Sequence, residues 1–177
     1  MKNLSLHIPK YEELSYREKI LSQKDTMNYN ASYDLDNKYY HKDTGCLDFP
    51  EKEWGSWFNK WINNFPNNYY AYIVKDNRFI GEVNLRYIIK KDWYEMGIVI
   101  ENNYRGNSYS KKALEILLQV AFEKYNAKAV HNMFEINRNA ALKLHKDLGF
   151  MIISEYDDLI ELLLTKEEYY DNKKKEG

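Results

Sequence analysis

Apolar and polar positions alternate along several short stretches of the chain, which is the pattern of β-strands. The first stretch, Leu4, Leu6 and Ile8, ends at Pro9. Three later stretches follow one another with short links and predict an antiparallel meander, with a tight turn at residues 76–78. The predicted strands lie near residues 4–8, 69–75, 79–87, 93–100, 129–134, 151–155 and 158–164.

Apolar residues at helical spacing predict four helices, at residues 11–22, from Pro50 to about 62, 111–125 and 139–148. The second helix has an aromatic face that favours a core position over a ligand platform. Asn139 is a plausible N-cap and Gly149 a plausible C′ residue for the last helix. The aromatic face consists of Trp54, Trp57, Phe58 and Trp61, with Ile62 beside it.

The order of these elements predicts a mixed α/β fold with a mostly antiparallel central sheet flanked by helices. The 177 residues suit one domain, which we place at residues 1–170. The charged tail, residues 171–177, is expected to be disordered. Residues 24–50 show no clean period, and a loop of this length is usually functional or mobile.

Composition excludes several classes of protein. The net charge of −1 argues against nonspecific binding of nucleic acid, which needs a basic face. A single cysteine, Cys46, forms no internal disulfide and fits a reducing cytoplasm. No apolar run approaches the length of a membrane span, and the N-terminus lacks the apolar core of a signal peptide, so we expect a cytoplasmic protein. The four histidines show no metal-ligand spacing, so no metal site is expected.

The junction between the strand at 93–100 and the following helix suits an anion. Small or polar residues fill this turn, so a ligand can approach the backbone. Free N–H groups of the first helical turn and the helix dipole attract phosphate. The turn is neither a P-loop nor a dinucleotide fingerprint, and many such turns bind nothing. The stretch reads Arg105-Gly106-Asn107-Ser108-Tyr109-Ser110-Lys111.

This turn resembles the cofactor motif of the GNAT (GCN5-related) acyl-CoA N-acyltransferases, Arg/Gln-x-x-Gly-x-Gly/Ala after a strand. Arg105 matches the first position, and Ser108 and Ser110 replace the two glycines. A serine is costly wherever φ must be positive. Residues 141–150, ending in Leu-Gly-Phe, are similar to the second family motif. Residues 160–169 look like the last strand of the branch that contains ribosomal-protein N-terminal and polyamine acetyltransferases.

The resemblance covers roughly residues 70–170 and implies an acetyltransferase fold that binds acetyl-CoA. It also implies that the strand before the turn splays away from its parallel neighbour to admit the thioester. Arg138 occupies a position where the family often has an asparagine facing the pantetheine, and an asparagine flanks it on each side. The implied cofactor-binding residues are Ile98, Val99, Ile100, the whole turn from Arg105 to Lys111, Asn137, Arg138 and Asn139.

Acetyl transfer requires loss of a proton from the amine and protonation of the leaving thiolate. Glu95, two residues before Gly97, matches a glutamate frequent in the resembled branch and is the first candidate base; Glu82 is the second. His145 lies where many members have a tyrosine proposed as the acid. The alternatives are a solvated strand carboxylate for Glu95 and an ordinary surface or core histidine for His145.

In the resembled fold, the region between the first strand and the meander forms one wall of the acceptor cleft. The segment between residues 29 and 53 is acidic and rich in tyrosine, so such a wall would attract a cationic amine, such as a polyamine, an aminoglycoside-like compound or a basic peptide. A solvated acidic loop is the alternative. The acceptor would then be a small molecule or peptide amine, and a homodimer is one option for the assembly. The sequence leaves a second class open, a non-catalytic acyl-CoA-binding or protein-interaction module on the same fold. The candidate acceptor residues are Tyr29, Tyr33, Asp34 and Trp93.

Overall fold

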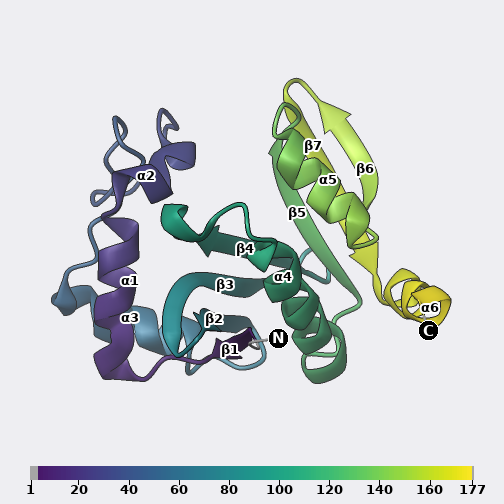
Figure 1. Ribbon diagram of the computed structural model, residues 1–177, viewed down its shortest axis with the longest axis horizontal. Helices are drawn as coiled ribbons and strands as arrows, with labels where there is room; N and C mark the ends of the chain where they lie inside the picture. The colour runs from purple at the N-terminus through teal and green to yellow at the C-terminus, as the bar shows by residue number, and fades with distance from the viewer. Residues whose placement is uncertain (1–3, 177) are drawn as a thin grey trace.

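A computed structural model describes residues 4–176, and its centre is one sheet with strand order β1-β2-β3-β4-β5-β7-β6 (Figure 1). All neighbouring strands are antiparallel except β4 and β5, which are parallel. The predicted mixed α/β class and the seven strands are confirmed. The strands are β1 (Ser5–His7), β2 (Asn68–Lys75), β3 (Arg78–Ile88), β4 (Trp93–Ile100), β5 (Ala129–Glu135), β6 (Met151–Tyr156) and β7 (Leu159–Thr165).

The helices agree with the predicted periods, with two additions. A short helix, α2, interrupts the segment expected to be irregular, and a further helix, α6, ends the described chain. Among residues 4–176, no helix has the length and hydropathy to span a bilayer. The helices are α1 (Leu14–Leu21), α2 (Lys24–Met27), α3 (Glu51–Trp61), α4 (Tyr109–Gln119), α5 (Asn139–Asp147) and α6 (Lys166–Glu176), and a π-helical turn at Val120–Lys124 extends α4.

The alternation of β3 and β4 divides their side chains between two layers. One face packs against α4, where Ala113, Leu114 and Leu117 are fully buried. The other face lies under α1 and α3, where Val99 packs against a second cluster that includes Leu14 and the aromatic face of α3. Because register pairs Glu82 with Val99 and Asn84 with Gly97, these polar residues also point toward the second layer.

The parting of β4 from β5 is the feature that makes room for a ligand. Only two residue pairs join the strands, Tyr94 with Val130 and Glu95 with His131. Beyond Glu95 the strands diverge, which confirms the splay implied by the family resemblance (Figure 1). From Met96 to Ile100, β4 is therefore paired only with β3, and its opposite edge faces open space.

The C-terminal segment differs from the expectation of a disordered tail. Residues 171–176 continue α6; Gly177 lies outside the described residues. Tyr169 is buried in the main core and stacks on Phe122, with ring centroids 4.5 Å apart, so it fixes the start of this helix. Lys173 then pairs with Glu123 at 3.1 Å. A sequence period could not show these tertiary contacts, because the helix itself is polar on almost every side.

We expect Tyr169→Ala to destabilise the protein by about 3 kcal/mol, because it empties a core position occupied by a stacked ring. For a chain of this size, the melting temperature should fall by roughly 6–12 °C. Thermal unfolding followed by circular dichroism measures this shift. Lys174→Ala on the exposed side of α6 is the matched control and should leave the melting temperature unchanged. Equal melting temperatures for Tyr169→Ala and wild type would mean that α6 does not contribute to the core.

Candidate active site

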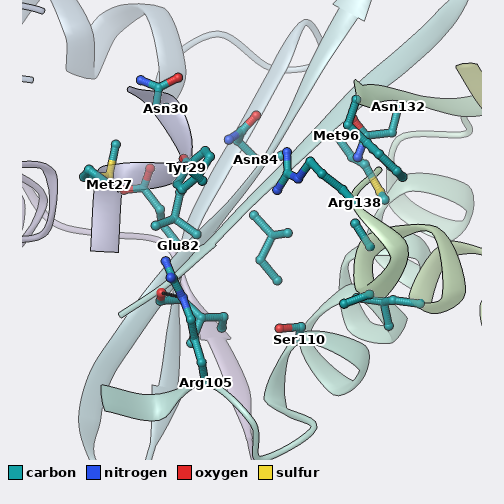
Figure 2. Close-up of a pocket in the computed structure, with 18 of the residues that line it drawn as sticks. Met27, Tyr29, Asn30, Glu82, Asn84, Met96, Arg105, Ser110, Asn132 and Arg138 are labelled. Atoms are coloured by element: carbon teal, nitrogen blue, oxygen red, sulfur yellow. Dashed lines mark hydrogen bonds between the residues drawn. The ribbon is translucent and has the colours of Figure 1, made fainter. Parts of the chain in front are cut away.

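The divergent edges of β4 and β5 line a cavity of about 680 Å³, which we call the central cavity (Figure 2). Residues 96–100 form one wall, residues 132–134 and the first turns of α5 form the other, and residues from α1 to Asn30 close the end. Of the predicted cofactor residues, Ile98, Val99, Ile100, Arg105, Ser110 and Arg138 line this cavity. Ser110 and Arg105 lie at its lower part in the view of Figure 2.

Asn84 forms part of the cavity wall because β4 has a glycine opposite it. A Cβ on Gly97 would lie only 2.7 Å from the Asn84 Nδ2 atom, so glycine is what allows the amide to lie against the strand. The Asn84 amide makes no hydrogen bond to any other residue in the described chain. It is therefore free to bind a polar group of a ligand in the cavity.

Glu82 is buried at the α1 end of the cavity, with 4% of its surface exposed. The Arg17 guanidinium donates to both carboxylate oxygens, at 2.7 and 2.8 Å, and the Tyr70 hydroxyl donates to one of them. The rings of Phe49, Trp57 and Tyr70 surround the guanidinium at 4.7–5.3 Å. Burial alone would lower the pKa of Arg17, but the Glu82 carboxylate more than offsets this and raises it. The cavity thus contains a fixed ion pair in an apolar aromatic box.

Glu95 and Trp93, two of the predicted site residues, do not line the central cavity. Glu95 shares the face of Glu82 on the sheet but lies where β4 is still paired with β5, and it forms an ion pair with Arg86 on β3. Trp93 stacks on His131, with ring centroids 4.5 Å apart. Both lie on the closed side of the splay, a position that the sequence alone could not reveal.

His145 reaches the cavity from α5 but is 3% exposed. Its Nδ1 lies 2.7 Å from the Ala141 carbonyl oxygen, so Nδ1 must carry the proton. The Asn132 side-chain oxygen accepts from the Met133 N–H at 2.9 Å, which turns the Asn132 amide nitrogen toward His145 Nε2 at 3.0 Å. Burial lowers the pKa of His145. The imidazole is therefore neutral near pH 7, and its one N–H is already donated, which does not favour the expected acid role.

The turn between β4 and α4 presents an array of backbone N–H groups. Gly106 and Ser108 have φ values of +79° and +60°. Ser108 therefore adopts a left-handed backbone conformation, which costs more for serine than for the glycine of the family motif. In the described chain, no backbone acceptor pairs with the N–H groups of residues 106–108, and those of the first helical turn have no intrahelical partner. Asn107, Tyr109 and Lys111 belong to this surface turn but do not line the cavity.

Arg105 is held by the chain around it. Its guanidinium donates to the Ile100 carbonyl at 3.1 Å and to the Thr26 carbonyl at 2.6 Å. The Asn102 N–H donates to the Thr26 hydroxyl at 3.0 Å. These bonds tie α2 to the end of β4, and they place Met27 and Tyr29 opposite the divergent strands.

A second, outer cavity of about 420 Å³ adjoins the first, since Tyr29 and Arg138 line both. Tyr33 and Asn137 also line the outer cavity. Arg138 stands before the first residue of α5, Asn139, and makes no side-chain cap. The helix therefore begins at Asn139 instead of being capped by it, and Asn139 lines neither cavity.

Residues 29–33 form one wall of the outer cavity, but none of the carboxylates of the acidic segment, residues 29–53, lines either cavity. Asp34 pairs with Lys42, Asp48 with His41 at 2.9 Å, and Glu53 with Lys38 at 3.8 Å. The two lysine pairs offset two of the six carboxylates of the segment. Tyr29 does reach the cavity; burial raises its pKa, and the charge of Glu82 adds to this effect.

Sequence reasoning missed four polar residues that line the central cavity: Arg17, Asn30, Asn84 and Asn132. Asn84 and Asn132 lie inside strands, which is a usable signal because asparagine is depleted in strands. Arg17 had no such signal, since a charged residue on an amphipathic helix usually faces solvent.

The sequence model of the acetyltransferase (GNAT) domain matches residues 9–151. The chain therefore belongs to the GNAT acetyltransferase family and is an enzyme of that class, as the motifs at residues 105–110 and 141–150 predicted. A comparison with curated protein sequences finds no match.

Several solved structures share the fold. The spermidine/spermine N-acetyltransferase SpeG from Vibrio cholerae, in complex with manganese ions, aligns with a TM-score of 0.71 at 14% identity, over 96% of this chain and 96% of that one. FdhC, described as a nucleotide-linked sugar GNAT, aligns with a TM-score of 0.72 at 20% identity, over 99% and 93%. The N-acetyltransferase PseH from Campylobacter jejuni, solved in complex with acetyl coenzyme A, aligns with a TM-score of 0.55 at 20% identity. The alignment covers 64% of this chain and 78% of that one. At these identities the likeness is one of fold.

The state of His145 can be tested by titration. Its pKa is lowered by folding, so the unfolded chain binds a proton that the folded chain does not as pH falls below about 6.5. The histidine therefore contributes stability above that pH, and this contribution is lost on acidification. The NMR signal of the imidazole, assigned with His145→Gln, should titrate below pH 6.5. Between pH 6.5 and 5 the wild type should lose more unfolding free energy than His145→Gln; a titration midpoint at or above 6.5 would contradict the neutral network.

Proposed function

We propose that this protein transfers the acetyl group of acetyl-CoA directly to a primary amine bound in the central cavity. The observation that carries the proposal is the splay of β4 from β5, which opens a cavity next to a turn of unpaired backbone N–H groups. GNAT enzymes use acetyl-CoA, and the solved PseH complex contains it. An acyl donor needs such an open strand edge, because its amide groups can replace the missing strand.

The turn from Gly106 to Lys111 would hold the phosphates of acetyl-CoA, through its N–H groups and the N-terminal dipole of α4. The acyl arm would run from there between residues 96–100 and the β5 wall. Asn132 and Asn84 offer amides along this path. Asn137 and Asn139 lie outside the central cavity, so we assign them no contact with the arm.

Glu82 is the group that we propose to bind the amine and accept its proton. A lysine-like amine with a pKa of about 10.4 is almost entirely protonated at neutral pH, so a carboxylate in the cavity would first attract it. Glu82 lines the cavity and keeps unused lone pairs beside Arg17 and Tyr70, whereas Glu95 lies outside it. The neutral His145 would position Asn132, and the departing thiolate would take its proton from solvent or from the amine.

Two acceptor classes are suggested by the relatives, spermidine or spermine for SpeG and a nucleotide-linked sugar for FdhC. The carboxylates of residues 29–53, which favoured a cationic acceptor, do not line the cavities, so the observed linings support a polyamine less than the sequence did. A non-catalytic acyl-CoA-binding module is the competing function. Its support is Ser108, whose positive φ strains the cofactor turn.

Acetyl-CoA affinity should respond in opposite ways to two substitutions in the turn. Gly106→Val should weaken binding roughly tenfold, because a β-branched residue resists positive φ by about 1–2 kcal/mol. No atom lies within 4 Å of a Cβ at Gly106, so the effect is one of backbone conformation and not of collision. Ser108→Gly relieves strain and should bind as tightly as wild type or more tightly. Isothermal calorimetry measures both, and unchanged affinity in Gly106→Val would remove the turn from the cofactor site.

Turnover should separate the two glutamates. In an assay of thiol release from acetyl-CoA with a panel of amines, Glu82→Gln should lose about tenfold or more in kcat/KM, with partial recovery at high pH, where the amine loses its proton unaided. Glu95→Gln should stay close to wild type.

Circular dichroism and acetyl-CoA calorimetry must show that Glu82→Gln is folded, because it leaves Arg17 without its ionic partner. Tyr70→Phe, which removes one hydrogen bond to the same carboxylate and keeps the ion pair, serves as a second variant. A large loss in Glu95→Gln with little change in Glu82→Gln would return the base role to Glu95. Absence of turnover with every amine, despite tight acetyl-CoA binding, would favour the non-catalytic module.

A further inference from the structure

Positive charge is concentrated in the central cavity of a chain whose net charge is −1. The cavity is lined by three arginines and one glutamate, a formal charge of +2 when His145 is neutral. The charged residues are Arg17, Arg105, Arg138 and Glu82. An acceptor site for a polycation would show the opposite balance, because burying like charges together is unfavourable.

The three arginines are not equivalent. Arg17 is neutralised by Glu82, with which it forms two short hydrogen bonds. Arg105 pairs with no carboxylate in the described chain, but its N–H groups serve backbone carbonyls beside the cofactor turn. Arg138 differs from both. Its guanidinium donates no hydrogen bond to residues 4–176 and forms one long ion pair, at 3.7 Å, with Glu135, which also lines the outer cavity.

Arg138 lies at the boundary between the two cavities. Figure 2 shows its guanidinium pointing into the central cavity from the α5 side. The same group lies over the ring of Tyr29 at 5.6 Å, and both residues line the outer cavity. No residue of the cofactor turn lines the outer cavity. An anion bound to Arg138 would therefore be on the acceptor side, away from the N–H groups that we assign to acetyl-CoA.

We propose that the acceptor is a primary amine that carries a phosphate group, with the amine at Glu82 and the phosphate at Arg138. This inference rests on the proposed acetyltransferase function. The planar guanidinium presents paired N–H donors that match phosphate oxygens. Phosphate suits the site better than a terminal carboxylate, because a phosphodiester can link the amine-bearing part to a further group. The outer cavity, with Tyr29 and Tyr33 on its wall, offers a place for that group.

Binding tests the inference without a known acceptor. The protein is first saturated with acetyl-CoA, so that the cofactor phosphates occupy their own site, and is then titrated with inorganic phosphate, uridine diphosphate or acetate. Uridine diphosphate should bind wild type, and Arg138→Met should weaken it about tenfold or more, as expected for a lost charged hydrogen-bonding group. Arg138→Lys should fall between the two. Arg78→Met, which removes an arginine from the β2–β3 turn outside both cavities, should bind as wild type.

Turnover provides the second readout, with glucosamine, glucosamine 1-phosphate, uridine diphosphate–glucosamine, β-alanine and spermidine as matched amines. The phosphorylated amines should have the highest kcat/KM, and Arg138→Met should raise their KM while leaving acetyl-CoA affinity unchanged. Preference for spermidine that is indifferent to Arg138→Met would overturn the inference and leave the proposed function standing.

Other results would also overturn it. Failure of phosphate and uridine diphosphate to bind the saturated protein, or equal binding to wild type and Arg138→Met, would show that Arg138 holds no acceptor anion. If β-alanine were the only amine acetylated, the group bound by Arg138 would be a carboxylate and not a phosphate. Loss of acetyl-CoA affinity in Arg138→Met would assign the arginine to the cofactor. A wild type that binds no acetyl-CoA would refute the proposed function itself, and the inference with it.

Discussion

The parting of β4 from β5 is the constraint on which the rest of the site depends. Two residue pairs hold the parallel strands together, and beyond them the edge of β4 has no strand partner. An unpaired edge inside a protein is costly unless something satisfies its backbone groups. The same divergence opens the central cavity and directs β4 into the turn before α4, so donor and acceptor sites arise from one departure from regular sheet geometry.

The wall opposite the splay is kept in place by polar contacts in addition to the second apolar cluster. The Arg17–Glu82 pair joins α1 to β3, and Thr26 joins α2 to Asn102 and Arg105. A buried ion pair adds little net stability, because desolvation offsets most of its attraction. Its value here is positional: Arg17, held among the aromatic rings, hydrogen-bonds the Glu82 carboxylate where that carboxylate lines the cavity.

Charge is sorted by the tertiary structure in a way that composition conceals. Two acidic residues after α2, Asp34 and Glu53, pair with lysines of the same segment, and none of the segment's carboxylates lines either cavity. The arginines come from three distant parts of the chain and meet at one cavity. A formal charge near zero for the whole chain is thus compatible with a distinctly cationic site.

The sequence by itself determined the strands, the main helices, the mixed α/β class and the family, because these follow from local periodicity and from motifs contiguous in the chain. It also located the turn at Gly106 and Ser108, although not the positive φ of the serine. Tertiary structure alone decided that Glu82 lines the cavity and Glu95 does not. The two side chains lie on the same face of neighbouring strands, so the strand pattern in the sequence does not distinguish them. The two glutamates differ because Glu95 belongs to the last residue pair that joins β4 to β5. The position of that last pair depends on pairing between strands far apart in the sequence. For the same reason, only the folded chain could bring Arg17, Asn84 and Arg138 to one cavity.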